Sequence, residues 1–520
     1  MAHESGRNTI AKNTIYLYFR MMFTMVVALY TSRVILKILG AEDYGIYQTV
    51  GGVVGMLSFL NGALSTGTSR FLTFELGAGD VNKLKRTFST VLFAHLILAF
   101  IILIIAETVG LWFVCNKLII PENRMTAAVM AYHFSIVAAI VSITQVPYTA
   151  CIIAREKMGI YAYMSIIEAV LKLSIVYLLS IGDWDKLGFY AFLYLIVNVI
   201  IASVYRLYCV RHFDESKFRL LFDKSILKNV LSYSGWNLLA NTSLALVNQG
   251  GLVLINLFFT PIVVTAQTLA SQVNMAATQF IQNFRTAANP QIVKRYATKD
   301  YDGSKHLLLS STKYSYFLML MLVLPIVLVS DILLELWLGE VPEYTSGFLK
   351  ITAIGSLFSV FDTSFYTALY AKGRIRENAL ISPFIYALVF PITYFCFKAG
   401  MSPLSLSIGM VCASAIVGLI VKPYLIVKIV DYKWEEIIFV LRTCLIVTLT
   451  SLIIPLLVYI NRNLLFPNNI IEFLIITIVS IISVLVSAFV FGVDRVNKKR
   501  IIDFVIKKTN NENRHTDSTI

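Results

Sequence analysis

Charged residues are scarce in this sequence, at 14% of 520 residues, whereas apolar residues make up 58%. Soluble domains carry about 25% charged and roughly 45–50% apolar residues. The deficit excludes a soluble enzyme, a disordered chain and a nucleic-acid-binding protein built from exposed basic surface. Long apolar runs recur instead, and a helix needs roughly 20 such residues to cross a bilayer. The sequence therefore predicts an all-α polytopic membrane protein.

Sequence motifs for catalysis or cofactor binding are also missing. The six cysteines form no CxxC pair and lie in or beside apolar runs, so they indicate neither a disulfide framework nor a metal site. No GxxxxGK, HExxH or GxSxG element occurs. We expect no metal, no cofactor and no enzymatic activity. A membrane polymerase or ligase is the weakest alternative, because the connections between spans are short.

Hydropathy predicts about fourteen spans, an even number that places both termini on one side of the membrane. The connections and the tail on that side, with the N-terminus, hold 35 of the 44 Lys and Arg residues, the opposite connections hold 8, and Lys172 lies mid-span. The positive-inside rule then makes both termini cytoplasmic. The expected spans are 13–38, 44–66, 87–106, 126–149, 160–181, 187–205, 230–259, 262–284, 307–330, 347–371, 379–397, 401–421, 437–459 and 472–493.

An internal repeat is visible at an offset of about 217 residues. It divides the chain into a six-helix bundle at 1–215, a second at 216–430, two further spans at 431–493 and a basic, polar cytoplasmic tail at 494–520. Both halves share one topology, as in transporters built from parallel repeats. The matched pairs are Lys12 with Lys228, Arg70 with Arg285, Asp80 with Asp300, Lys85 with Lys305, Arg155 with Lys372, and Tyr177 with Tyr394.

The stretch 31–47, TSRVILKILGAEDYGIY, ends the first span in "LG" followed by an acidic "YG-Y" turn. With the six-plus-six-plus-two layout, it resembles the O-antigen and capsule flippases of the MOP exporter superfamily. That resemblance implies a MATE-like fold in a bacterial inner membrane. It also implies flipping of an undecaprenyl-pyrophosphate-linked oligosaccharide by alternating access, in contact with membrane lipid and polysaccharide assembly enzymes, without nucleic acid.

Cations and amides at membrane depth are the candidate substrate-binding groups, because lipid cannot satisfy them. Arg20 shares a helical stripe with Thr24 and Thr31, and Arg70 and Arg285 end spans two and eight, where guanidinium groups suit a pyrophosphate. Snorkelling or ordinary flanking positions are the alternative for these arginines. Residues 229–284 lack any charge, and their amides suit sugar hydroxyls or simple interhelical packing. The cavity candidates among them are Asn237, Asn241, Asn248, Gln267 and Asn274.

Three ionisable residues inside spans are candidates for ion coupling. Glu168 precedes Lys172 by four residues, the favourable order for an ion pair on a helix. Asp362 shares a face with Ser359 and Tyr366. Structural roles are the alternative for all three. If they do couple an ion, a cation-coupled multidrug exporter of the MATE type becomes the competing function, although many such exporters use an acidic residue in the first span and this span carries none.

Overall fold

The computed structural model describes residues 2–181, 184–217, 219, 221–232, 245–374, 376–466, 468–494 and 498. Every element among them is helical, and eleven helices are long and apolar enough to cross a membrane. The predicted all-α polytopic class is confirmed. The first two predicted spans share one continuous element and the seventh lies partly outside the described residues, so fourteen is an approximate count.

The helices follow one another with short connections. Those of the first part are α1 (Ala2–Met56), α2 (Ser58–Ala78), α3 (Val81–Ile105), α4 (Leu111–Lys117), α5 (Met125–Ala154), α6 (Met158–Leu178), α7 (Lys186–His212) and α9 (Gly251–Asn256). Those of the second part are α10 (Pro261–Ala297), α11 (Tyr301–Leu338), α12 (Thr345–Lys372), α13 (Arg376–Lys398), α14 (Ser405–Ile416), α15 (Lys422–Val430), α16 (Trp434–Ile460), α17 (Arg462–Leu465) and α18 (Asn469–Ser487). Four π-helical turns interrupt them: η1 (Ala106–Gly110), η4 (Leu246–Gly250), η5 (Val417–Val421) and η6 (Ala488–Gly492).

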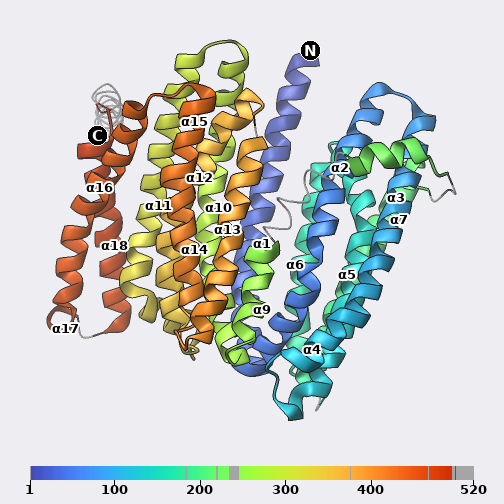
Figure 1. Cartoon of the computed structure of the whole chain (residues 1–520), viewed down its shortest axis with the longest axis horizontal. Coiled ribbons are helices and arrows are strands. Elements are labelled where there is room, and N and C mark those ends of the chain that lie inside the picture. Colours follow the sequence, from blue (N-terminus) through green and yellow to red (C-terminus); the bar gives the residue numbers. More distant parts are fainter. Residues whose placement is uncertain are drawn as a thin grey trace, which may run out of the picture. The chain divides into compact units, whose positions relative to one another are not determined.

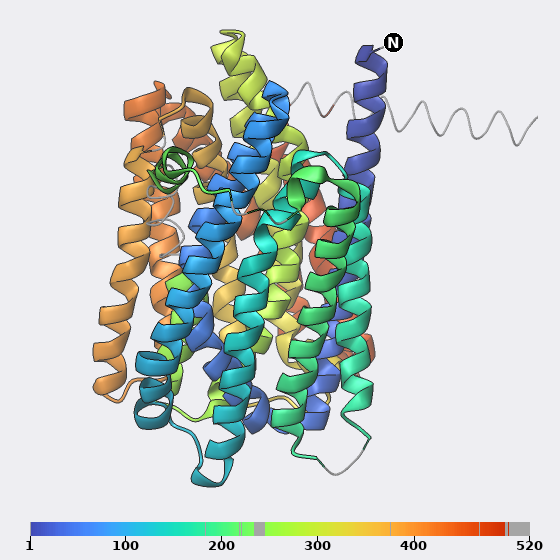
Figure 2. The ribbon, with the colours of Figure 1, turned by 90° about the vertical axis from the view of Figure 1, so that its right-hand side faces the viewer.

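The chain forms two compact units. Unit 1 comprises Met1–Ala276, Trp337–Thr352 and Ala379–Ala413, and unit 2 comprises Ala277–Leu336, Ala353–Asn378 and Ser414–Ile520. Within unit 1, α3, α5 and α7 run side by side, as Figures 1 and 2 show. Within unit 2, α16 packs against α18. The functional division into six-helix bundles stays a prediction.

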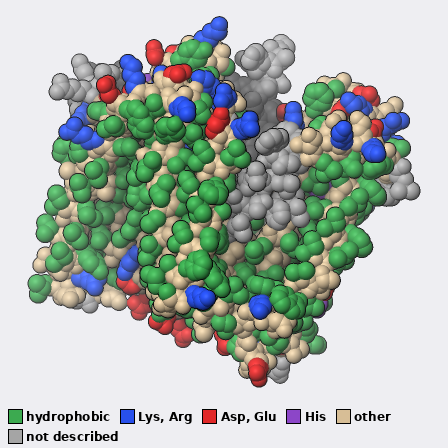
Figure 3. Space-filling view, in the orientation of Figure 1, with side chains coloured by type: hydrophobic (Ala, Val, Ile, Leu, Met, Phe, Trp, Pro, Cys, Tyr) green, Lys and Arg blue, Asp and Glu red, His purple; other side chains and the backbone are tan. Residues whose placement is uncertain are grey.

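The lateral surface of the helices is apolar. Figure 3 shows hydrophobic side chains covering this surface, and Lys and Arg gathering at the end of each unit drawn uppermost. We call this end of each unit the basic end. In unit 1 it carries Lys83, Lys85 and Arg155, and in unit 2 it carries Lys305 and Lys372. An apolar wall with charge collected at its end is the pattern expected of a chain embedded in lipid.

Several helices extend further than hydropathy predicted. The twelfth span was expected to end at 421, yet the helix passes through η5 and continues in α15 to Val430. The prediction was wrong there because Lys422 was taken as the end of the apolar run. In the structure Lys422 is only 2% exposed, so the helix carries a buried cation inside it.

The η1 turn depends on a glycine beside a tyrosine. A π-turn leaves carbonyls without their usual i+4 donors, and the Tyr132 hydroxyl donates to the Ala106 carbonyl at 2.7 Å. A Cβ on Gly110 would collide with that hydroxyl. Glycine at 110 therefore lets α5 reach and satisfy the π-turn.

Gly110→Ala is expected to lower the free energy of unfolding by roughly 1–3 kcal/mol, because the added methyl group overpacks this contact. Adding Tyr132→Phe should relieve the clash and recover part of the loss. The matched control is Gly77→Ala in α2, where a Cβ meets nothing within 4 Å. Unfolding in a graded SDS titration measures all three variants. Equal stability of Gly110→Ala and Gly77→Ala would contradict the assignment.

Candidate functional site

The YG turn docks α1 onto other helices of unit 1. Arg124 donates to both carboxylate oxygens of Asp43, from Nε at 2.8 Å and from Nη2 at 2.6 Å. The Tyr44 hydroxyl accepts from Gln272 Nε2 at 3.0 Å. A Cβ on Gly45 would strike the Pro261 carbonyl, so glycine permits close approach to the start of α10. The motif that carried the family resemblance therefore acts as a packing element in unit 1.

Arg20 lies against α6 inside unit 1. Its guanidinium carbon is 4.8 Å from the centre of the Tyr161 ring, a cation–π distance, and Nη1 approaches Ser165 Oγ to 3.5 Å. Arg20 Nε is buried without a hydrogen-bond partner among the described residues. A buried guanidinium N–H without an acceptor is costly, so this face of Arg20 is suited to receive an anionic oxygen.

The ion pair expected one to two turns further along α6 is present. Lys172 Nζ donates to Glu168 Oε1 at 2.6 Å and lies 4.9 Å from the centre of the Tyr194 ring. Both side chains keep about a third of their surface exposed, 30% for Lys172 and 34% for Glu168. We call Arg20, Glu168 and Lys172 the unit 1 ion cluster. It contains two cations for one carboxylate.

Unit 2 contains a more deeply buried ion pair. Lys422 Nζ lies 2.9 Å from Asp362 Oδ1, with the Lys422 side chain 2% exposed and the Asp362 side chain 18% exposed. The same ammonium is 5.1 Å from the centre of the Tyr366 ring. Asp362 had been a candidate for ion coupling from the sequence, but its lysine partner, 60 residues away, had not been identified.

Arg285 reaches α12 from α10 within unit 2. Its Nη2 donates to the Thr363 carbonyl and, at 3.3 Å, to Thr367 Oγ1, and the side chain is buried at 4% exposure. The Asp362 carboxylate lies close enough to stabilise its charge. We call Arg285, Asp362 and Lys422 the unit 2 ion cluster. It too contains two cations for one carboxylate.

Close helix packing positions the unit 2 ion cluster. A Cβ on Gly418 would lie 2.6 Å from the Phe358 carbonyl oxygen, so the missing side chain lets η5 approach α12. Lys422 follows Gly418 by four residues and lies on the same side of the helix. Arg206, 216 residues before Lys422, donates to Thr144 Oγ1 of α5 at 2.6 Å. The repeat offset, applied to Arg206, would have pointed to Lys422.

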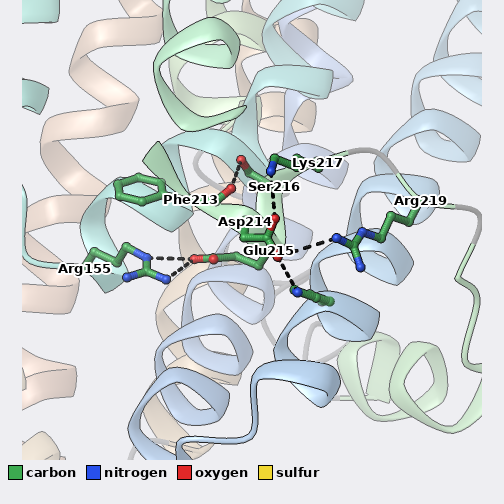
Figure 4. A network of polar contacts seen from close by, with 8 residues as sticks. Arg155, Phe213, Asp214, Glu215, Ser216, Lys217 and Arg219 are labelled. Atoms are coloured by element: carbon green, nitrogen blue, oxygen red, sulfur yellow. Dashed lines mark hydrogen bonds and ion pairs between the residues drawn. The ribbon is translucent and has the colours of Figure 1, made fainter. Parts of the chain in front are cut away.

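A cluster of charges joins helices at the basic end of unit 1 (Figure 4). Arg155 Nη2 lies 2.7 Å from Glu215 Oε1, and Glu215 is only 4% exposed. Neighbouring Asp214 pairs with Lys217 at 2.8 Å and with Lys85. These two cations hold the pKa of the Asp214 carboxyl well below its usual range. We call this group the unit 1 clasp, because it ties the segment after α7 to α5 and α3.

Unit 2 has an equivalent arrangement at its basic end. Lys372 lies 3.3 Å from Asp431 Oδ2, and Lys305 Nζ donates to the Asp431 carbonyl at 2.6 Å. Lys372 and Lys305 are the repeat partners of Arg155 and Lys85. We call this group the unit 2 clasp. The same three elements are joined in each half, which supports the internal repeat through tertiary contacts rather than sequence matches alone.

The repeat also explains two matched helix starts. Asp80 Oδ1 accepts from the Lys83 N–H at 2.9 Å, and Asp300 Oδ1 accepts from the Gly303 N–H at 3.0 Å. Each aspartate caps the N-terminus of the helix that follows it, α3 or α11. The pair that the sequence matched is therefore structural in both halves.

The remaining predicted residues lie in different settings. Arg70 is exposed on α2 with its guanidinium 5.8 Å from the centre of the Phe71 ring. Gln267 Oε1 accepts from Ser407 Oγ at 3.3 Å, which is the interhelical packing contact considered as its alternative role. Asn274 is half-buried on α10. Asn237 and Asn241 lie outside the described residues, as does the side chain of Asn248.

By sequence, no family model and no curated relative matches the chain. Solved structures do match. The lipid II flippase MurJ in an inward closed conformation matches with a TM-score of 0.68 and 12% identity, covering 92% of this chain and 98% of its own. An inward-facing multidrug resistance MATE transporter of the MOP superfamily matches with a TM-score of 0.67 and 15% identity, covering 80% and 98%.

The chain has the fold of a MOP-superfamily transporter. A third match is a MOP-superfamily transporter from Pyrococcus furiosus, with a TM-score of 0.57, 16% identity, and coverage of 81% of this chain and 97% of its own. These neighbours are transporters and a flippase rather than enzymes. At identities this low the likeness establishes the fold, and the substrate has to be argued from the residues of this chain.

Proposed function

We propose that the protein flips a diphosphate-linked lipid oligosaccharide across the bacterial inner membrane, for O-antigen, capsule or exopolysaccharide assembly. The observation that supports this most is the charge balance of the two ion clusters. Each holds two cations for one carboxylate inside apolar helices, and an anionic substrate compensates such an excess. Tyr161, Tyr194 and Tyr366 lie against these cations and offer aromatic faces of the kind that sugars pack on.

In the proposed cycle, the bundles 1–215 and 216–430 alternate between openings to the two sides of the membrane. The basic ends face the cytoplasm, as the positive-inside rule requires, and both termini lie there. Arg20, with its unpartnered Nε, binds a phosphate oxygen of the substrate. The lipid tail remains in the bilayer, and polysaccharide assembly enzymes supply and consume the substrate.

A second candidate is a cation-coupled multidrug exporter. It is favoured by the carboxylates of Glu168 and Asp362, which lie within spans and keep 34% and 18% of their side-chain surface exposed. A protonatable carboxylate beside a lysine is suited to exchange a proton for an organic cation. The excess of cations around both carboxylates makes this function the weaker candidate.

The proposal is tested in proteoliposomes with a fluorescent diphosphate-linked prenyl oligosaccharide. Arg20→Ala is expected to lower the initial flipping rate roughly tenfold or more, because a charge-assisted hydrogen bond contributes about 1.5–3 kcal/mol. Arg285→Lys keeps the charge without the planar fork and should reduce the rate less. The matched control is Arg374→Ala, at the basic end with its side chain 59% exposed; its rate should equal that of the wild type.

A wild-type protein that ignores this lipid but extrudes organic cations on a proton or sodium gradient would establish the exporter instead. Equal rates for Arg20→Ala and Arg374→Ala, with both variants folded, would remove Arg20 from the substrate path.

A further inference from the structure

Unit 1 has a polar pocket at its basic end, away from the ion cluster. It has a volume of about 450 Å³ and lies between the end of α2, the start of α3 and the helical residues 224–232. Phe71, Glu75, Lys83, Arg86, Asp223 and Asn229 line it. Nothing in the proposed transport cycle uses this pocket.

Glu75 is the unusual group in the pocket. Its side chain is 5% exposed, and Lys83 Nζ lies 3.0 Å from Oε1. Oε2 is buried with no hydrogen-bond partner among the described residues. A buried carboxylate oxygen without a donor is costly, so the pocket lacks a hydrogen-bond donor at this point.

The other acids of the pocket are already engaged. Asp80 Oδ1 caps the start of α3, and Asp223 Oδ1 accepts from the N–H groups of Ser225 and Ile226 at 2.9 and 3.2 Å. Arg86 is exposed and has no ion pair among the residues that the structure describes. The groups left to bind a ligand are thus one carboxylate oxygen and one guanidinium, an acceptor and a cation in the same cavity.

The internal repeat shows that the fold does not need Glu75. Its counterpart falls among residues 286–299, which contain no Asp or Glu. The caps at Asp80 and Asp300 are present in both halves, whereas the buried acid is present in one. A buried carboxylate that the second half omits is better explained by a ligand than by helix packing.

Exposed aromatic rings flank the pocket and favour a lipid over a soluble compound. Phe74 is 66% exposed, and Phe93 and Phe222, 44% and 53% exposed, stack edge to face at 5.4 Å. Such rings at the end of apolar helices lie where acyl chains meet headgroups.

We propose that this pocket binds a phosphoethanolamine group, carried by a membrane lipid. The primary ammonium donates to Glu75 Oε2, and the phosphate accepts from Arg86, assisted by Lys83. The inference is independent of the transported substrate. Phosphatidylcholine carries the same phosphate, but its quaternary ammonium has no N–H to donate to Glu75.

The test measures lipid binding to the detergent-purified full-length protein by native mass spectrometry and thermal unfolding. Phosphatidylethanolamine should bind about tenfold more tightly than phosphatidylcholine, with the N-methylated lipids between them. Glu75→Gln should abolish this discrimination, and Arg86→Gln should weaken both lipids. Glu377→Gln, another acid paired with a basic residue at a basic end, is the control and should leave binding unchanged.

The methylation series on the wild type needs no variant, so the proposal is testable even if Glu75→Gln does not fold. Soluble glycerophosphoethanolamine distinguishes the sources. Binding of the lipid alone assigns the site to the membrane, and competition by the soluble compound shows that the headgroup suffices. Equal binding of the ethanolamine and choline lipids, or discrimination retained in Glu75→Gln, would overturn the proposal.

Discussion

Lys422→Met is expected to destabilise the protein by roughly 3 kcal/mol, the largest effect of any single substitution considered. Removing one partner of a buried ion pair costs about 3–5 kcal/mol, because the other charge stays buried. Arg285 remains near Asp362 and offsets part of the loss. The free energy of unfolding in an SDS titration measures the effect.

The double variant Lys422→Met with Asp362→Asn should recover most of that stability, since both charges are gone. It separates stability from transport: the folded double variant is expected to flip the substrate poorly, because the cluster has lost the cation beside Tyr366. Wild-type stability in the single variant would mean that Asp362 is already neutral.

Arg155→Gln is the second substitution with a large expected effect. It leaves Glu215, at 4% exposure, without its cation, and we expect a loss of about 3 kcal/mol. The internal repeat supplies the control: Lys372→Gln breaks the equivalent pair, but Asp431 is 80% exposed. Exposed pairs contribute about 0–1 kcal/mol. The two clasps therefore predict unequal costs for the same change.

The same SDS titration compares the two variants. Adding Glu215→Gln to Arg155→Gln should restore most of the stability, because the uncompensated carboxylate is removed. Equal losses for Arg155→Gln and Lys372→Gln would show that burial of Glu215 does not control the energetics of the clasp.

The sequence predicted those features of the fold that depend on local pattern. Apolar runs located the helices, and a spacing of four residues located the Glu168–Lys172 pair, because both partners lie on one helix. The Asp362–Lys422 pair joins residues 60 apart, and only the packing around Gly418 brings them together. Hydropathy also misplaced the end of the twelfth span, since it scores a lysine as polar whether or not a carboxylate neutralises it.

The candidate site was predictable only in part. Arg20 and Arg285 stood out as cations in or beside apolar spans, but Arg285 proved to be bound to the backbone of α12. The buried acids Glu75 and Glu215 gave no signal, because each lies near the end of an apolar run, where a solvated charge is expected. Their surroundings come from segments distant in the chain, and hydropathy does not report such contacts.

The π-turn Val417–Val421 has a consequence for how distant chains of this fold are compared. Such a turn accommodates one more residue than an α-helix needs for the same rise, and each residue rotates a helix by about 100°. A relative lacking that surplus residue would point its equivalent of Lys422 away from α12, although the helix itself would superpose. Conserved architecture and conserved charge placement can thus diverge through a single insertion, so the position of a cation has to be compared in space rather than in an alignment.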